Sequence, residues 1–457
     1  MSPDPCGPSK DRTYWLETLG CPKNQVDSDK LEGTLLAGGY VPAASPQDAD
    51  LVVVNTCAFV EAAREESVGS ILEMGAAKRE GARLVVTGCM AERYGGELAA
   101  QLPEVDLVAP FGVPVTIGAK QSRLLPSFDL LNLPRPPAAA PWAYLKVAEG
   151  CDRRCGFCAI PSFRGPQRSR SMDAILEEVD ALGDGLRGGL KEVVLVAQDL
   201  ASWGLDRSIG QSRARAREPA RGEAEVVSRP IAGLVEVLAK RVPRVRLLYI
   251  YPSSLDDRLV EAILRTGVPY FDLSLQHASR PLLARMRRPG DGERFLSRIQ
   301  SIREAEPDST IRSSFVIGYP GETEEDHDEL LSFLQAAQLD WAGFFPYSEE
   351  AGTHAAALDR KVAPGLALER LRECSEAQDA VTASRREALV GETVEVLVDS
   401  PGKARSHREA PEIDGVVRVP AGIPAGEILR VLVTGVQFPD LEAAPVLGTS
   451  ARAEPAA

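Results

Sequence analysis

Strand-like runs alternate with amphipathic helical runs along most of this chain. In the N-terminal part we expect strands at Tyr14–Thr18, Leu51–Asn55 and Leu84–Thr87, separated by helices such as Asp29–Ala37 and Glu61–Lys78. Strands that are joined by helices pair as parallel neighbours, so the alternation predicts βα units on a parallel sheet. The chain is therefore expected to be an α/β protein.

A second, longer α/β run follows the segment Leu131–Trp142, whose prolines and alanines continue neither a helix nor a central strand. Six strands that alternate with helical patterns predict a (βα)6 partial TIM barrel. These strands are expected at Tyr144–Ala148, Glu192–Ala197, Arg246–Tyr251, Phe271–Leu275, Ile311–Ile317 and Ala342–Tyr347.

The pattern changes at Gly391, after a helical stretch at Leu366–Ala388. The runs ETVEVLVD, EIDGVVRV and EILRVLVTGVQF are rich in strand-forming residues and are separated by Gly, Pro and Asp turns. They predict a small antiparallel β-barrel or sandwich, and we expect the barrel. We therefore expect three domains, at residues 12–130, 137–388 and 390–453.

Composition narrows the possible partners and location. A formal charge of -14 argues against a chain held to nucleic acid by general electrostatics. Met1–Arg12 has no apolar leader, and no apolar run is long enough to span a bilayer, so we expect a cytoplasmic protein with no membrane association. The Arg-rich stretch Ser208–Arg229 is expected to be a solvated insertion rather than a nucleic-acid arm.

The eight cysteines are too few for a disulfide scaffold in a chain of 457 residues. Cys6, in the N-terminal tail, is expected to be a free thiol, and Cys374, in a helical run, a small packed residue. The other six form two sets of three.

The first of these sets lies in EGCDRRCGFCAIP, directly after the first barrel strand. It places Cys151, Cys155 and Cys158 in one loop at the carboxyl end of a strand, where α/β folds carry their active sites. A four-iron cluster with three protein ligands keeps one iron open for a small molecule. The alternative is structural zinc, which needs a fourth ligand, and the sequence places none of the four histidines near this loop: His277, His327, His354 and His407.

The remaining cysteines, Cys21, Cys57 and Cys89, each follow an expected strand of the N-terminal part. On a parallel sheet the three strand ends share one edge, and adjacent strands are about 4.8 Å apart. Three thiolates can therefore converge on a second cluster. The alternative is three buried, inert cysteines.

The spacing C-x3-C-x2-C, with Phe157 before its last cysteine, resembles the motif of the radical S-adenosylmethionine enzymes. The resemblance implies that S-adenosylmethionine binds the open iron of a [4Fe-4S] cluster. Gln198 ends the second strand, and SSFVIGYPGETE contains Val316 and Gly318 in a segment similar to the fifth strand of that family. We expect four residues to contact S-adenosylmethionine: Phe157, Gln198, Val316 and Gly318.

The whole layout resembles the methylthiotransferases of this class, which implies two [4Fe-4S] clusters, the second of which carries or receives the inserted sulfur. TLGCPKNQVDSDKLEG around Cys21 is similar to the branch that modifies an aspartate β-carbon of the small-subunit ribosomal protein uS12. YIYPSS, MRRPG and FFPYSEEAGTHAA also resemble that branch. An acidic C-terminal domain suits a basic ribosomal protein.

Two alternatives stay open: a transfer-RNA adenosine methylthiotransferase and a zinc-stabilised RNA-binding module. The resemblance also implies an electron donor such as flavodoxin. One segment departs from the family pattern, because Leu200–Gly204 stands where a Thr-Thr-Arg-Tyr-like run is usual. The departure concerns the side of the barrel that is expected to face the substrate. The cluster chemistry is not affected, because all six cysteines are present.

Overall fold

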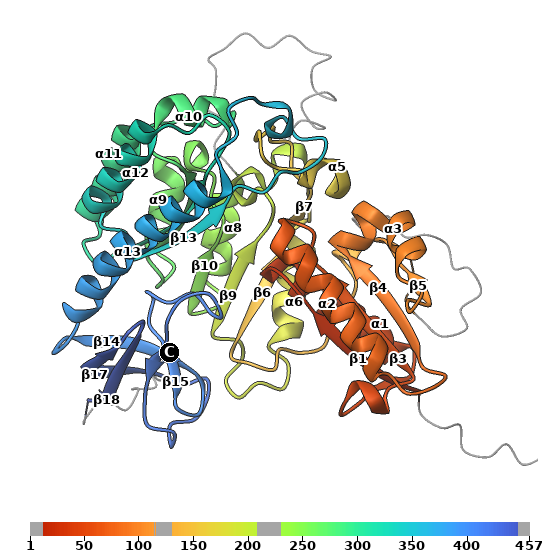
Figure 1. Ribbon diagram of the computed structural model, residues 1–457. Helices are drawn as coiled ribbons and strands as arrows, with labels where there is room; N and C mark the ends of the chain where they lie inside the picture. Colours follow the sequence, from red (N-terminus) through yellow and green to blue (C-terminus); the bar gives the residue numbers. More distant parts are fainter. Residues whose placement is uncertain (1–11, 114, 116–129, 208–229, 447–457) are drawn as a thin grey trace, which may run out of the picture. The chain divides into compact units, whose positions relative to one another are not determined.

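The computed structural model describes residues 12–113, 115, 130–207 and 230–446 (Figure 1). Cys6 and the insertion Ser208–Arg229 lie outside these residues. The chain forms two compact units. The first unit comprises residues 1–136 with the short segment 162–165, and the second comprises residues 137–161 and 166–457. The expected domain boundaries remain predictions.

The first unit is built on a five-stranded sheet in the order β2-β1-β3-β4-β5, and all its pairs are parallel. Its strands are β1 (Arg12–Thr18), β2 (Tyr40–Pro42), β3 (Leu51–Thr56), β4 (Arg83–Gly88) and β5 (Leu107–Val108). Its helices are α1 (Pro22–Ala37), α2 (Glu61–Ala77) and α3 (Cys89–Gln101), with the short 3-10 helix η1 (Pro46–Asp48). Every residue of the central strand β3 is buried, as expected for a strand covered on both faces.

The three central strands of this sheet were predicted from the sequence, whereas its edge strands and α3 were not. The edge strands are only 3 and 2 residues long, too short to show a pattern. The period of α3 is broken at Tyr94, whose φ of -126° is not helical, and the next two residues are glycines.

Within residues 137–207 and 230–388, the barrel of the second unit has six strands in two parallel groups, β10-β9-β6 and β11-β12-β13. A parallel bridge between Ile250 and Leu273 joins the groups. The strands are β6 (Trp142–Lys146), β9 (Glu192–Val196), β10 (Arg244–Leu247), β11 (Tyr270–Gln276), β12 (Thr310–Ile317) and β13 (Trp341–Pro346). The predicted (βα)6 partial barrel is therefore confirmed.

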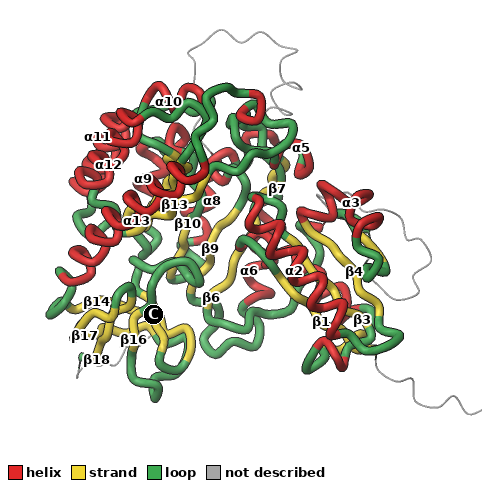
Figure 2. The backbone as a smooth tube through the Cα atoms, viewed as in Figure 1, coloured by secondary structure: helices red, strands yellow, loops and turns green. Residues whose placement is uncertain are grey.

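The barrel helices lie along the outside of the strands (Figure 2). Buried residues of both form one large apolar core. Several begin at Ser, Asp or Thr caps, and Thr323 forms a complete capping box. The helices are α6 (Met172–Leu182), α8 (Pro230–Leu238), α9 (Asp257–Leu264), α10 (Arg280–Arg285), α11 (Gly292–Ala305), α12 (Glu324–Ala337) and α13 (Pro364–Glu387). Shorter elements are β7 (Ala148–Glu149), α5 (Ile160–Arg164), β8 (Arg168–Ser169), η2 (Leu200–Ser202), η3 (Pro252–Ser254) and η4 (Ala355–Ala357). Cys374 is fully buried in α13, as predicted.

The C-terminal strands form a closed barrel in the order β14-β15-β16-β18-β17. They are β14 (Thr393–Ser400), β15 (Lys403–Arg405), β16 (Val417–Arg418), β17 (Ile428–Gln437) and β18 (Asp440–Pro445). The predicted small β-barrel is confirmed with one difference, because β16 and β18 pair in parallel. A closed ring of five strands cannot alternate direction throughout, so one parallel pair is required.

The C-terminal barrel packs against the amino ends of the parallel strands. Glu192, the first residue of β9, accepts hydrogen bonds from Arg246 Nε (2.7 Å) and Arg405 Nη1 (3.0 Å). Tyr270, the first residue of β11, donates its hydroxyl to Asp414 Oδ2 at 2.6 Å. Because active sites of such barrels lie at the carboxyl ends, this domain covers the opposite end.

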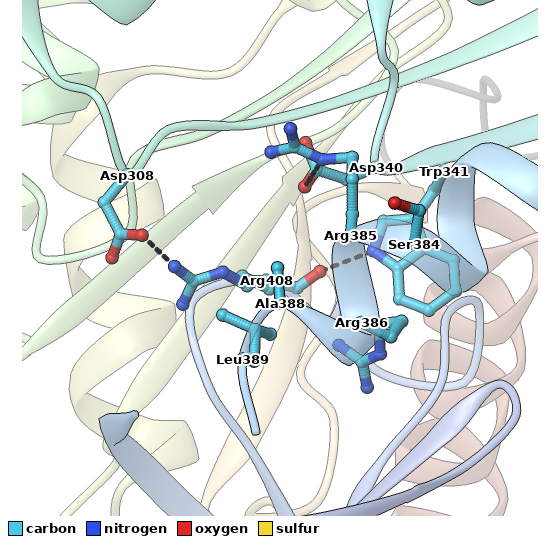
Figure 3. A pocket seen from close by; sticks show the side chains of 9 residues that line it. All are labelled: Asp308, Asp340, Trp341, Ser384, Arg385, Arg386, Ala388, Leu389 and Arg408. Atoms are coloured by element: carbon cyan, nitrogen blue, oxygen red, sulfur yellow. Dashed lines mark hydrogen bonds and ion pairs between the residues drawn. The ribbon is translucent and has the colours of Figure 1, made fainter. Parts of the chain in front are cut away.

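A cavity of about 240 Å³ lies at this junction (Figure 3). Arg385 Nε donates to Asp340 Oδ1 at 2.7 Å, and the indole of Trp341 donates to the Arg408 carbonyl at 2.7 Å. The cavity is lined by Asp308, Asp340, Trp341, Ser384, Arg385, Arg386, Ala388, Leu389 and Arg408. Asp340 directly precedes β13, so the cavity too lies at the amino ends of the strands.

Among the described helices, none combines the length and apolar character needed to cross a bilayer.

Candidate cluster sites

The cysteines of the second unit form what we call the loop site: Cys151, Cys155 and Cys158. The loop is fixed at its middle, where Gly156 N donates to the Met286 carbonyl and Gly156 O accepts from Ala355 N, both at 2.8 Å. A Cβ at position 156 would lie only 2.6 Å from the hydroxyl of Tyr319. The close approach of Tyr319 therefore requires a glycine at the centre of the cysteine loop.

Two arginines bring positive charge to the loop site. The guanidinium groups of Arg153 and Arg288 stack on the ring of Tyr251, at 4.0 and 3.9 Å from its centroid. Arg288 Nη1 donates to the sulfur of Cys155 at 3.4 Å, and Arg153 Nε donates to Asp199 Oδ2 at 2.6 Å. Nearby cations stabilise thiolates and other anionic groups.

Burial opposes that effect for two of the three thiols. It raises the pKa of Cys151 to about 11 and the pKa of Cys158 to about 12. Charge on Asp199 and Cys155 raises the pKa of Cys151 further, and charge on Cys155 and Cys151 raises that of Cys158. Metal ligation by these thiols must therefore displace protons.

The cysteines of the first unit form what we call the three-segment site: Cys21, Cys57 and Cys89. Cys21 is the N-cap of α1, Cys57 directly follows β3, and Cys89 is the first residue of α3. A Cβ on Gly20 would be 3.0 Å from the Cys57 sulfur, which shows how closely the first two segments approach. Two of the thiols thus lie at helix N-termini, where the helix dipole favours negative charge.

The side chain of Asn24 ties the three segments together. It is fully buried, and its Nδ2 donates to the carbonyls of Leu19 and Thr56, both at 3.0 Å. Its Oδ1 lies 3.5 Å from the sulfur of Cys89. A single amide therefore links the segments that follow β1, β3 and β4.

Arg164 also belongs to this site. It follows the cysteine loop in sequence, but the segment 162–165 is part of the first unit. Its Nη2 donates to the sulfur of Cys89 and to Asn24 Oδ1, both at 3.0 Å. Its Nη1 donates to Asp27 Oδ2 at 3.0 Å. Neither Asn24 nor Arg164 was predicted from the sequence. Asn24 stands in the CPKN motif, whereas no spacing signal identified Arg164.

The three thiols of this site differ in acidity. Burial opposes ionisation of Cys21, but the charges of Lys23 and Arg164 lower its pKa below the usual range. Burial raises the pKa of Cys57 to about 11, and charge on Cys21 and Cys89 adds to the shift. Burial also raises the pKa of Cys89, although Arg164 opposes that rise. Cys21 is therefore the most readily ionised of the three.

Three protein-family models match the chain in succession. They are the uncharacterized protein family UPF0004 at residues 13–110, the radical SAM superfamily at residues 145–334 and the TRAM domain at residues 390–446. Each cysteine site falls inside one of the first two matches.

Curated relatives match nearly the whole chain. It is 40% identical to the ribosomal protein uS12 methylthiotransferase RimO of Moorella thermoacetica, over 91% of this chain and 95% of that protein. It is also 40% identical to the protein of the same name from Saccharopolyspora erythraea, over 95% of both chains. The chain belongs to the RimO methylthiotransferase family. It is therefore a radical S-adenosylmethionine enzyme, as the sequence analysis predicted, and the alternative of a non-catalytic zinc module is wrong.

The cofactors of this RimO family member are S-adenosylmethionine and [4Fe-4S] clusters. Among the described residues, no three Cys, His, Asp or Glu side chains are placed to hold a single metal ion. In a four-iron cluster each thiolate binds a different iron, so its ligands need not meet at one ion. Two sets of three neighbouring thiols fit that requirement. The six cysteines stay predicted ligands.

The four predicted S-adenosylmethionine contacts of this RimO family member lie in the second unit. Phe157 is half-buried in the cysteine loop, and Val316 is half-buried on β12. Gln198 and Gly318 follow the carboxyl ends of β9 and β12. Gln198 Nε2 donates to Glu149 at 2.7 Å, while its buried Oε1 has no hydrogen-bond partner among the described residues. An unused buried acceptor fits a bound ligand, and all four assignments remain predictions.

The segment that departs from the family pattern has a local structural role. Leu200 and Ala201 are buried in the barrel core. Ser202 Oγ donates to Asp199 Oδ2 at 2.7 Å and accepts from Arg153 Nη2 at 3.3 Å. These residues therefore support the cysteine loop through Arg153.

Proposed function

We propose that this enzyme adds a methylthio group to the β-carbon of an aspartate in ribosomal protein uS12. The observation that carries the proposal is the 40% identity to uS12 methylthiotransferases along nearly the full length of both chains. The LGCPKN motif around Cys21 supports the same branch. The partner is therefore a basic ribosomal protein, free or within the small subunit.

Cys151, Cys155 and Cys158 would hold one [4Fe-4S] cluster, and Cys21, Cys57 and Cys89 the other. When bound, these groups supply electron transfer to S-adenosylmethionine, radical abstraction of a hydrogen atom, and the sulfur for insertion. Gly156 fixes the loop that holds the first set. Gln198 would accept a hydrogen bond from S-adenosylmethionine through its free Oε1, beside Phe157, Val316 and Gly318.

The charge of the C-terminal barrel supports this choice of partner less than its composition suggests. Asp399 is paired with Arg405, Glu409 with Arg386 and Asp414 with Arg312. Because these carboxylates are paired with largely buried arginines, they add little negative charge to the surface of the domain. The motif around Cys21 and the relatives therefore carry the substrate assignment.

A cytoplasmic location and an electron donor such as flavodoxin are parts of the same proposal. Both follow from the chemistry, because ribosomal proteins are cytoplasmic substrates and a [4Fe-4S] cluster needs a low-potential reductant before it can act.

The test is a reaction of the anaerobically reconstituted full chain with S-adenosylmethionine, reductant and either uS12 or transfer RNA. Mass spectrometry should find a methylthio group on an aspartate of uS12 and none on adenosine. Cys151→Ser should form no product. Product on transfer RNA alone would overturn the substrate, and no product with either partner would overturn the function.

A further inference from the structure

The guanidinium of Arg164 lies inside the three-segment site. The residue is only 4% exposed, and its charge lies 4.1 Å from the centre of the Phe111 ring. One terminal nitrogen, Nη1, pairs with Asp27. The other, Nη2, faces the sulfur of Cys89 and the amide oxygen of Asn24, each 3.0 Å away. The arginine thus joins a carboxylate to a predicted cluster ligand.

The chemistry of this contact goes beyond structural support. A guanidinium stays protonated in proteins, so Arg164 places a permanent positive charge beside the sulfur of Cys89. In a buried site that charge acts through a lower effective dielectric constant than it would in water. A hydrogen bond from a cation to sulfur also withdraws electron density from the ligand.

These effects act differently on the two redox states of a cluster. A [4Fe-4S] core of charge 2+ with three thiolates carries a net charge of -1. Uptake of one electron from a reductant gives a 1+ core and a net charge of -2. A fixed cation and a hydrogen bond to sulfur stabilise the more negative state, and therefore raise the reduction potential.

We propose that Arg164 is a positioning residue that tunes the cluster held by Cys21, Cys57 and Cys89 toward its reduced state. This inference rests on the proposed function, in which these cysteines bind that cluster. Arg164 holds the Cys89 sulfur against Asn24, and its charge sets how readily the cluster accepts an electron.

A matched control is available in the same unit. The side chain of Arg135 is as buried as that of Arg164, with 3% exposed in each, and its Nη1 pairs with Asp29 Oδ2 at 3.1 Å. Asp29 lies two residues after Asp27 on α1. Arg135→Gln therefore removes a buried arginine paired with the same helix, and the carboxylate of that pair lies eight residues beyond Cys21.

The experiment uses the full-length chain with Cys151, Cys155 and Cys158 changed to Ala, so that only the three-segment site takes up iron and sulfide. The midpoint potential of this cluster is measured by anaerobic redox titration followed by electron paramagnetic resonance. In that background, Arg164→Gln should shift the midpoint to lower potential and alter the spectrum. Arg164→Lys should shift it less, because it keeps the charge and loses the planar fork. Arg135→Gln should match the parent.

Each other outcome decides against part of the inference. Unchanged potentials in both Arg164 variants, or an equal shift in Arg135→Gln, would overturn the role of Arg164 alone. If Arg164→Gln takes up no iron, Arg164→Met, which also removes the charge, decides, and a potential equal to that of the parent overturns the inference. A parent that takes up no iron would overturn the ligand assignment of the proposed function, and this inference with it.

Discussion

The two cysteine sites are built in opposite ways. The three-segment site collects one cysteine from each of three strand ends, and a fully buried amide, Asn24, ties the segments together from inside the unit. The loop site has its three cysteines within eight residues, and Gly156 is fixed by residues Met286 and Ala355, far along the chain. The geometry of the first site is thus a property of its sheet, whereas the second depends on distant segments of the barrel. Both sites place one arginine on one cysteine sulfur, Arg164 on Cys89 and Arg288 on Cys155.

The largest expected effect comes from removing one cysteine of each site, because the two variants should lose different reaction products. Cys155→Ser should abolish both 5′-deoxyadenosine and methylthio transfer, each by more than about 100-fold, because loss of a ligand exceeds the effect of losing an outer-shell contact. Cys57→Ser should abolish methylthio transfer to the same degree but leave 5′-deoxyadenosine formation. Liquid chromatography of the nucleoside and mass spectrometry of uS12 measure the two outcomes. Equal loss of 5′-deoxyadenosine in both variants would mean that the sites do not divide the chemistry.

Removal of the internal tie should weaken only the three-segment site. Asn24→Ala removes the hydrogen bonds to the carbonyls of Leu19 and Thr56 and one of the two acceptors of Arg164 Nη2, at a cost of about 3 kcal/mol in unfolding free energy. Denaturant unfolding and iron content check this, with Gln25→Ala, on the exposed face of the same helix, as the control. Iron loss confined to the loop site would contradict the division between the sites.

The corresponding change in the loop site is Gly156→Ala. The added methyl group would lie 2.6 Å from the Tyr319 hydroxyl, so the loop or the tyrosine must move, at a cost of about 2 kcal/mol. We expect less iron in the loop site and a lower melting temperature. Gly69→Ala, in α2, meets no atom within 4 Å and should be neutral or slightly stabilising. Normal iron content in Gly156→Ala would show that the position of Gly156 against Met286, Ala355 and Tyr319 does not determine the geometry of the loop site.

The smallest expected effect is a loss of stability of the second unit at acidic pH. All four histidines lie in the second unit, and burial lowers the pKa of His277 to about 3. The unfolded chain binds a proton there below about pH 6.5 and the folded chain does not, so stability present above that pH is lost as the pH falls. Between pH 7 and 5.5 this amounts to about 1 kcal/mol. Hydrogen exchange should show the loss in the second unit, reduced in His277→Asn; equal loss in both units would argue against this origin.

Local pattern was enough to predict most of the fold, because most strands are apolar runs that end at turn residues or at helical stretches. β3 is buried on both faces, and the runs of the six barrel strands coincide with the observed ones within a few residues. The strands β2 and β5 and the helix α3 were missed because they are short or interrupted by glycines. The parallel pair β16–β18 follows from closure of the ring, which no single strand reveals.

The cysteines of the candidate site were visible in sequence because each follows a strand or stands in a compact motif. The groups that support them were not. Arg164 contacts Asn24 across 140 residues of chain, and Arg288 contacts Cys155 across 133. An arginine carries no sign in sequence of whether its partner will be a carboxylate or a sulfur. The role of such a residue emerges only when the chain has folded.

The position of the C-terminal barrel sets a minimum size for any partner that it recognises. This domain packs on the amino ends of the strands, whereas the cysteine loop follows the carboxyl end of β6. β12 has 8 residues, which at about 3.3 Å per residue corresponds to roughly 26 Å. A free amino acid or short peptide cannot touch both ends at once. Any substrate that is gripped by this domain during the reaction must reach around the height of the catalytic barrel, as an extended protein segment or a ribosomal particle can.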